Sequence, residues 1–369
     1  MKKSTQIVLS VIAVSLSAII ILVVWRSSAS RTSSGGEVRG VLLGDMPADA
    51  SGVLYVDVAQ LRQASFAKKL FAWAPKPQAD AEYTRFVQET GFDYERDLHR
   101  VAFAAAKRGS QSIWFAVADG TFDQKKIAAY MARVGVIQKH GNHEIYCIPT
   151  GLPVTTTGNI ALASVAPQIS FAFLRAGRIA ATNDADLAAY LDQKNSTADP
   201  VQWATRFARL AGSPVFAVVR QDANTASSLA AQAPGGLQSP QLSALLGQLS
   251  WLTLAGQPEG DSLRIVAEGE TASDTVARQL ADMLNGVVIL AQAGLNGAKN
   301  TQQLDPQTRA AYLELLKSTD ITRLDREDLK AVRVVFEITP NFLNAATAPK
   351  PTAPALDATS APTKHPPRK

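Results

Sequence analysis

The stretch VAFAAAKRGSQSIWFAVADGTFDQKKIAAY, residues 101–130, reads as a strand, a tight turn, a second strand and a helix in one continuous run. Residues 251–280, WLTLAGQPEGDSLRIVAEGETASDTVARQL, lie over it without a gap at a constant offset of 150 residues. Ser112 then matches Ser262, although few other positions are identical. The simplest interpretation is that the chain contains an internal duplication.

The two stretches also share the place where their helix starts. Thr121 matches Thr271, and Thr121 with Gln124 three residues later has the spacing of a helix capping box. We therefore expect a helix over residues 121–134 and an equivalent helix that begins at Thr271.

Strand-like and helix-like segments alternate on either side of these stretches. Short turns separate neighbouring strands, which favours antiparallel pairing. The expected fold is α+β: internally duplicated, mostly antiparallel sheets with helices packed on one face, preceded by one transmembrane helix. The first copy covers residues 45–200 and the second covers residues 201–344.

Three polar or small-residue segments flank or interrupt this unit. Residues 26–44 are rich in Ser and Gly and are typical of a flexible stalk. Residues 221–240 have the composition of a long surface loop. Residues 345–369, rich in Pro, Ala and Lys, hold too few large apolar side chains to fold, and we expect a disordered tail.

Residues 7–25, IVLSVIAVSLSAIIILVVW, form an uncharged apolar run of 19 residues. A helix of that length nearly crosses the hydrocarbon core of a bilayer, which is about 30 Å thick. Trp25 and Arg26 follow where an aromatic side chain and a cation are common at the membrane interface. A signal peptide cleaved after Ala29 is the alternative, but its apolar region would be shorter, and a retained anchor is favoured.

The positive charges around this run bear on its orientation. Residues 1–6 form a short tail with Lys2 and Lys3, which favours a cytoplasmic N-terminus, while Arg26 and two further arginines stand on the other side. We expect a single-pass protein of the bacterial inner membrane, with the bulk of the chain extracytoplasmic (periplasmic). The lipid bilayer is then a partner through residues 7–25. A cytoplasm-facing domain stays open as the alternative.

The segment MPADASGVLYVDVAQLR, residues 46–62, carries a PAD sequence followed by YVDV. It resembles the start of the ectodomain in uncharacterised bacterial membrane-anchored envelope proteins. That resemblance implies an exported, duplicated α+β domain behind a membrane helix. It implies no functional residues.

The net charge of +5 does not describe the folded part of the chain. The two ends, residues 1–40 and 345–369, hold nine of the 37 basic residues and two of the 32 acidic residues, so the remainder has a net charge of −2. A nucleic-acid-binding protein needs a dense positive footprint on its folded surface. We therefore expect no nucleic-acid partner.

One cluster of metal-ligand residue types occurs in KHGNHEIYC, where His140, His143, Glu144 and Cys147 lie within eight residues. Residues 141–142, Gly-Asn, indicate a two-residue hairpin turn that would place the two histidines opposite each other. On the strand that follows, Cys147 lies about 13 Å from His143, and Glu144 points to the other face. We expect no metal centre; His140 and His143 are the remaining weak candidates.

An acidic set, Asp261, Glu268 and Glu270, is the best candidate for paired carboxylates in acid–base catalysis. Glu268 and Glu270 share a strand face, but they lead into the expected helix at Thr271, where negative charge complements the helix N-terminus. A structural capping role is the favoured interpretation. Asp119 holds the comparable place in the first copy.

Other sequence signals point away from a specific reaction. Nucleophile, zinc-protease and phosphate-loop motifs are absent from the sequence, so we expect no catalytic residues and no cofactor. The helical apolar stripe over residues 275–293 is wide enough that any part left outside the core would serve a protein partner. The expected function is non-catalytic binding or a structural role in the cell envelope, and the candidate partner is an envelope protein. An envelope hydrolase built from dispersed Asp, Glu and His is the alternative, and the oligomeric state is not predicted.

Overall fold

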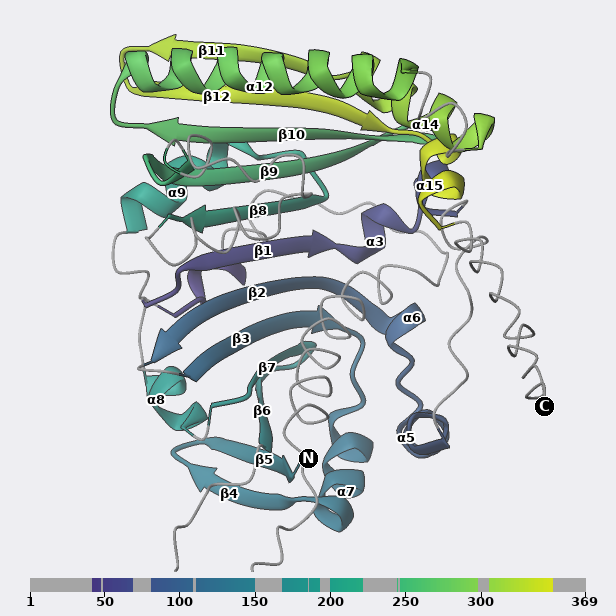
Figure 1. The fold of residues 1–369 in the computed structure, drawn as a ribbon. Helices are drawn as coiled ribbons and strands as arrows, with labels where there is room; N and C mark the ends of the chain where they lie inside the picture. The colour runs from purple at the N-terminus through teal and green to yellow at the C-terminus, as the bar shows by residue number, and fades with distance from the viewer. Residues whose placement is uncertain are drawn as a thin grey trace, which may run out of the picture.

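The structure is a computed structural model of the 369-residue chain. It describes residues 42–68, 81–149, 168–192, 200–221, 244–297 and 305–347, except Ala48, residues 109–110, Ala185 and Leu245. These segments build one sheet of twelve strands in the order β11-β12-β10-β9-β8-β1-β2-β3-β7-β6-β5-β4, and every neighbouring pair is antiparallel (Figure 1). The predicted α+β class with antiparallel pairing is confirmed.

The elements of the chain have the following bounds. The strands are β1 Gly52–Asp57, β2 Leu98–Arg108, β3 Gln111–Gly120, β4 Val136–His140, β5 His143–Pro149, β6 Gln168–Arg175, β7 Arg178–Thr182, β8 Val215–Arg220, β9 Leu249–Glu259, β10 Ser262–Thr271, β11 Asp320–Arg326 and β12 Leu329–Ile338. The helices are α3 Val58–Leu61, α5 Ala81–Thr90, α6 Tyr94–Asp97, α7 Gln124–Val134, α8 Leu187–Asp192, α9 Pro200–Arg209, α12 Asp274–Asn296, α14 Pro306–Lys317 and α15 Pro340–Thr347.

Strand register assigns each residue to one of two faces, because successive side chains point to opposite sides of a sheet. Tyr55 on β1 pairs with Ala102 on β2 and with Phe216 on β8. We call the side that carries these residues the Tyr55 face, and the opposite side the Leu54 face. The main hydrophobic cluster lies on the Tyr55 face and runs without a break from Cys147 on β5 to Trp251 on β9.

The two predicted copies therefore share one sheet and one core. Strand β1 of the first copy pairs directly with β8 of the second, and residues from both halves contribute to the main cluster. The described core also begins before residue 45: Leu42 and Leu43, at the end of the predicted stalk, are buried in the same cluster.

The strands repeat the same order outward from the central β1–β8 pair. The chain runs β1-β2-β3-α7 on one side and β8-β9-β10-α12 on the other, and a later hairpin, β6–β7 or β11–β12, pairs with the third strand of each half. The hairpin β4–β5 occurs in the first half alone among the described strands.

Each half carries a bulge at the same point. The β2–β3 register shifts at His99, which leaves that residue extra on β2, and the β9–β10 register shifts at Ser250, which is extra on β9. An offset of 151 residues therefore relates the strands, one more than the ungapped offset read from the sequence. The helices are still related by 150, because α7 starts at Gln124 and α12 starts at Asp274.

The predicted helix caps at Thr121 and Thr271 are wrong. Asp123 caps α7 by accepting a hydrogen bond from the backbone N–H of Lys126, and Ser273 caps α12 by accepting one from Val276. Strand β10 continues through Thr271, whose hydroxyl donates to backbone carbonyl groups near the strand end. Pairing within the sheet thus holds this threonine outside the helix.

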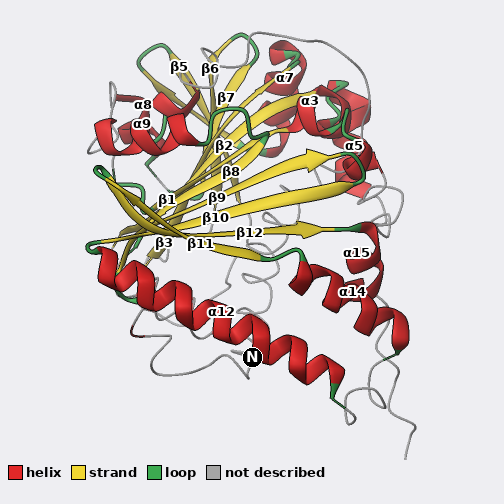
Figure 2. Cartoon of the chain, turned by 90° about the horizontal axis from the view of Figure 1, so that it is seen from above, coloured by secondary structure: helices red, strands yellow, loops and turns green. Residues whose placement is uncertain are grey.

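The predicted packing of helices on one face is also wrong. Leu280 of α12 packs near Val332 of β12, on the Leu54 face, whereas Trp203 of α9 packs with Trp251 on the Tyr55 face. Figure 2 shows α12 and α9 on opposite sides of the twisted sheet. A sheet with apolar residues on both faces needs cover on both.

The predicted membrane helix cannot be compared with this fold. Residues 7–25, including Trp25, and the following Arg26 lie outside the described residues, as do most of the predicted loop 221–240 and nearly all of the tail 345–369. Within the described part of the chain, no helix combines the length and the apolar character needed to span a membrane.

Candidate functional site

The histidine hairpin forms as predicted, with His140 of β4 directly opposite His143 of β5. Gly141 in the turn has a φ of +55°, a conformation that favours glycine. His140 Nε2 lies 2.8 Å from Asp192 Oδ1 on α8, and His143 Nδ1 lies 3.1 Å from the carbonyl oxygen of Phe173. Both rings are thus engaged with protein groups, and the histidines pack the hairpin onto its neighbours.

The other metal-ligand types in the hairpin are separated by the strand. Cys147 is buried in the main cluster on the Tyr55 face. Glu144 lies on the opposite face, where it accepts a hydrogen bond of 2.7 Å from the hydroxyl of Tyr146. Burial and this carboxylate raise the pKa of Tyr146 to about 12. Among the described residues, no three His, Cys, Asp or Glu side chains gather closely enough to hold a metal ion.

The acidic set divides between the two ends of β10. Asp261 lies in the β9–β10 turn, whereas Glu268 and Glu270 lie at the other end, on the Tyr55 face. Both glutamates are more than nine-tenths buried. The structure therefore brings two of the three predicted acids together and leaves the third outside.

Three arginines surround Glu268 and Glu270. Arg206 and Arg209 of α9 donate to Glu270, and Arg333 of β12 donates to Glu268 with a 2.8 Å bond from Nε. The Arg206 guanidinium also lies over the Trp251 ring, 4.0 Å from its centroid. We call these five charged residues the arginine–glutamate cluster. The predicted helix-capping role of the two glutamates is wrong, because α9 and β12 supply their partners.

The cluster is built to hold α9 on the sheet. Trp203, Phe207 and Leu210 give the helix an apolar side against the sheet, and Arg206 and Arg209 lie beside that side. Each of the two carboxylates accepts hydrogen bonds from arginine side chains. This arrangement can fix a helix but does not offer a free catalytic acid.

In the first half, Arg178 of β7 binds Asp119, the residue equivalent to Glu270 at the offset of 151. It is 2% exposed and donates through Nε and Nη2 to the two oxygens of Asp119, at 2.6 and 2.9 Å. Its Nη1 donates to Asp45, in the segment that enters the core from the N-terminal side. Burial lowers the pKa of Arg178, but the two carboxylates outweigh that effect and the pKa is raised. Burial raises the pKa of Asp45 despite the nearby arginine.

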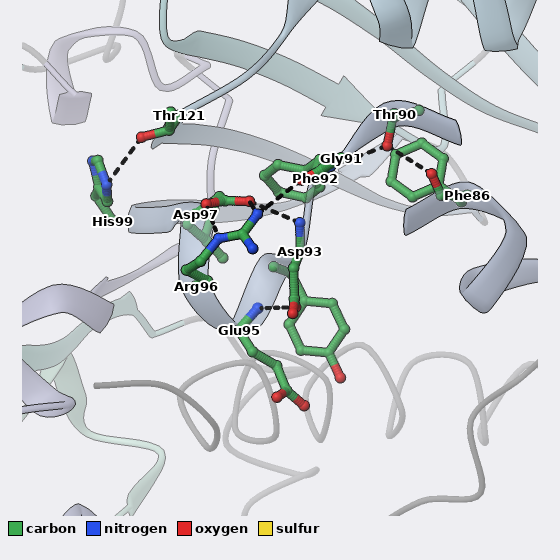
Figure 3. A network of polar contacts seen from close by, with 12 residues as sticks. Phe86, Thr90, Gly91, Phe92, Asp93, Glu95, Arg96, Asp97, His99 and Thr121 are labelled. Atoms are coloured by element: carbon green, nitrogen blue, oxygen red, sulfur yellow. Dashed lines mark hydrogen bonds and ion pairs between the residues drawn. The ribbon is translucent and has the colours of Figure 1, made fainter. Parts of the chain in front are cut away.

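A third polar network surrounds the one-turn helix α6 (Figure 3). Arg96 donates to both oxygens of Asp97, and Asp97 accepts a 2.8 Å bond from the backbone N–H of Asp93. Asp93 in turn accepts from the N–H of Glu95 at 2.9 Å. Figure 3 shows His99 turned away from this group, toward Thr121, with 3.4 Å between the ring Nε2 and the hydroxyl oxygen.

His99 lies on the β2 bulge with an exposed side chain, and partial desolvation and two nearby arginines lower its pKa. Its site on the β2 bulge explains its local geometry without any substrate. Arg62 lies beside α6 and is 4% exposed. Its guanidinium donates to backbone carbonyl oxygens of that turn, including that of Arg96 at 2.8 Å.

The Leu54 face of the central strands presents apolar side chains outside the core. Leu54 pairs with Phe103 on β2 and with Ala217 on β8, and this row of paired residues continues to Leu254 on β9. The neighbouring row on the same face runs from Leu252 on β9 through Val219 on β8 to Trp114 on β3. We call six half-buried or exposed residues of these rows the apolar strip: Phe103, Trp114, Ala217, Val219, Leu252 and Leu254. None of the six belongs to the four buried clusters formed by the described residues.

On either side of the apolar strip, a helix covers the Leu54 face of the sheet. Helix α12 packs on the Leu54 face over β12 and β10, and α7 packs on the same face over β5, β6 and β7. Phe103 and Trp114 stack with ring centroids 5.9 Å apart, and Leu254 is 38% exposed. The other five residues of the strip are half-buried.

The apolar stripe of α12 divides into a buried and an exposed part. Leu280 is 1% exposed in the core, whereas Ile289 and Leu290, two turns further on, are 64% and 73% exposed. The apolar residues of this helix that lie outside the core are therefore in its C-terminal half.

Sequence reasoning missed most partners of these groups. The arginines of the cluster lie about 60 residues from the glutamates they contact. One signal was available: Arg206 and Arg209 follow Trp203 in an otherwise apolar helix face, where unpaired cations are costly. The apolar strip was visible only as apolar residues at both strand parities in 215–219 and 251–255.

Comparison with known proteins gives limited information. Neither a protein-family model nor a curated protein sequence matches the chain. Two crystal structures of TP0453 are similar in outline: form III has a TM-score of 0.44 at 10% identity and covers 82% of this chain and 96% of that one. Form I has a TM-score of 0.41 at 10% identity, with coverage of 87% and 97%. Likeness at this level transfers no residue role and no activity.

Proposed function

We propose that this chain is a membrane-anchored domain with a non-catalytic binding role in the bacterial cell envelope. Residues 7–25 supply the anchor, in a single pass, and the domain lies on the extracytoplasmic side. The observation that carries the binding role is the apolar strip on the Leu54 face. The sequence run and the flanking Trp25 and Arg26 support the anchor.

The strip supports binding because its exposure has an energetic cost. Covering a large apolar side chain stabilises a protein or a complex by about 1.5–3 kcal/mol. Two aromatic rings and two leucines, Phe103, Trp114, Leu252 and Leu254, are only partly covered. An apolar partner surface would gain the part of that free energy that corresponds to the area still exposed.

The buried carboxylates support binding over hydrolysis. Glu268, Glu270 and Asp119 are all engaged by arginines, so the acids best placed for a shared site are committed to holding the fold. A cleft of about 490 Å³ between α14 and α15 has Asp305 and Glu314 in its wall. Asp305 already caps α14, and the described lining residues include no histidine. The hydrolase alternative therefore has no observation in its favour.

We also propose that the two halves arose by duplication. The shared strand order, the helix after the third strand and the bulges at His99 and Ser250 support it. Asp119 and Glu270 occupy equivalent positions at the offset of 151 residues. Two independent origins would not be expected to repeat a bulge and the acid beside it.

Topology can be tested with protease added to spheroplasts that express the full chain. The proposal expects digestion of the domain before lysis. A domain that survives until the cells are lysed would contradict the extracytoplasmic location and favour the cytoplasm-facing alternative.

The binding role can be tested by photocrosslinking in intact cells. A photoreactive amino acid at Leu254 should capture a defined envelope protein, and the same probe at Ile137 provides a control of similar exposure, 40% against 38%, at the far sheet edge. Equal capture at both positions, or none at Leu254, would contradict a binding role for the strip.

A further inference from the structure

The apolar strip lies between two helices that cover the same sheet face. The five strands from β9 to β3 are separated by four spacings, about 19 Å in all at the usual distance between strands. Helix α12 rises from this face on the β10–β12 side, and α7 rises from it on the β5–β7 side. A second sheet of a partner copy would meet these helices before it reached the strip. A slender occupant, such as one helix about 10 Å wide, would not.

The chemistry of the strip limits the occupant further. Its six side chains are Leu, Val, Ala, Phe and Trp, which offer a single polar group, the indole N–H of Trp114. An extended peptide laid on this face would leave its backbone polar groups without partners. A helix satisfies its own backbone groups, so an apolar helix suits this surface.

The chain carries one segment with these properties before its first described residue. Residues 7–25 contain no charge, and a helix of this length is about 28 Å long, enough to cross the five strands. It is apolar on all sides, which suits a helix covered from more than one direction. Residues 26–41 join it to Leu42 in the core, and 16 residues can reach up to about 53 Å.

We propose that residues 7–25 of the same chain dock on the apolar strip whenever the segment is not in a bilayer. The short tether supports this, because it holds the segment near the strip at an effective concentration in the millimolar range. The bilayer and the strip then compete for one segment. Insertion into the membrane uncovers the strip, and the binding role proposed above becomes available only to the anchored protein.

The experiment uses purified full-length chain with a cysteine-linked photocrosslinker. Cys147, the only cysteine, is first replaced by alanine, and the probe is attached at Leu254→Cys or, as the control, at Ile137→Cys. In detergent-free buffer, crosslinks to peptides from residues 7–25 should be on the order of tenfold more frequent from position 254. Vesicles of phosphatidylethanolamine and phosphatidylglycerol should remove that excess.

Mixing equal amounts of ¹⁴N- and ¹⁵N-labelled chains identifies the source of the segment. Docking within one chain yields crosslinked peptides of a single label, whereas mixed labels would show that a second copy supplies the segment and would overturn the proposal. Equal crosslinking from positions 254 and 137, or precipitation of the detergent-free chain, would overturn it as well. An Ile20→Asp variant should abolish the crosslink while circular dichroism shows that the domain stays folded.

These results are separable from those on the proposed function. Failure of the crosslink in buffer leaves the spheroplast test of topology unaffected. Digestion in spheroplasts combined with no docking in buffer would remove this inference alone.

Discussion

Asp119 and Glu270 occupy the same position in the two halves of the sheet, and each pairs with arginine from a different kind of element. Asp119 is engaged by Arg178 on the adjacent strand β7, whereas Glu270 is engaged by Arg206 and Arg209 from helix α9. One acid thus joins two strands, and the other fastens a helix to the sheet. The shared position sits beside a bulge, where the strand end is free to meet other elements.

Removal of Arg178 should destabilise the domain strongly. Arg178→Met leaves Asp119 and Asp45 without their cation, and breaking a buried pair from one side costs about 3–5 kcal/mol. Urea unfolding followed by circular dichroism measures the change in free energy. Arg326→Met, at an exposed position on β11, should change it by less than about 0.5 kcal/mol. Equal effects of the two variants would contradict a structural role for Arg178.

The arginine–glutamate cluster should behave as one unit in a double-mutant cycle. Glu270→Gln and Arg206→Met should each destabilise the fold, and the double variant should cost less than the sum, by about 0.5–3 kcal/mol. Glu259→Gln with Arg264→Met, an exposed pair with both side chains 47% exposed, should show almost no coupling. Additive effects within the cluster would show that its contacts are independent.

Asp97 should contribute to acid sensitivity. Burial opposes its ionisation, but the hydrogen bonds from Arg96 and from the backbone N–H of Asp93 outweigh burial and lower its pKa below 3.8. A depressed pKa stabilises the fold above the unfolded-state value and loses that contribution as pH falls through the folded-state value. Asp97→Asn should therefore lose less stability than the wild type between pH 5 and pH 2, as measured by thermal unfolding.

Truncation of an apolar side chain should destabilise the fold strongly in the N-terminal half of α12 and hardly at all in its C-terminal half. Leu280→Ala creates a cavity in the core and should cost about 2–5 kcal/mol. Leu290→Ala, at a residue 73% exposed, should change stability by less than about 0.5 kcal/mol. Denaturant unfolding of both variants checks this. A large loss at Leu290 would mean that the exposed part of the stripe is buried in solution.

Much of the secondary structure followed from local patterns. The hairpin at residues 141–142 was predictable because Gly-Asn adopts the turn that joins two antiparallel strands. The helices after β3 and β10 were predictable from their periodicity, but not their first residues. Thr121 and Thr271 fit a capping pattern, but Thr121 lies in the loop between β3 and α7, and Thr271 is the last residue of β10.

The faces of the sheet were not predictable in the same way. The offset of 150 residues aligned the helices correctly but shifted the strands by one position, which exchanges the two faces. The shift arises in the loop between the third strand and its helix, which has three residues in the first half (121–123) and two in the second (272–273), and no local pattern marks the missing residue.

The sequence by itself determined the class of the fold, the strand–turn–strand–helix order of residues 101–130 and 251–280, the apolar run at residues 7–25 and the concentration of positive charge at the two ends. These properties depend on composition and on neighbours within a few residues, which act whatever the rest of the chain does. Only the tertiary structure decided that both halves share one sheet, that Glu268 and Glu270 are bound by arginines, and that the apolar strip lies between α12 and α7. Those outcomes depend on pairing between residues far apart in the chain, and strand register, set by the packing of the whole sheet, decides which side chains meet.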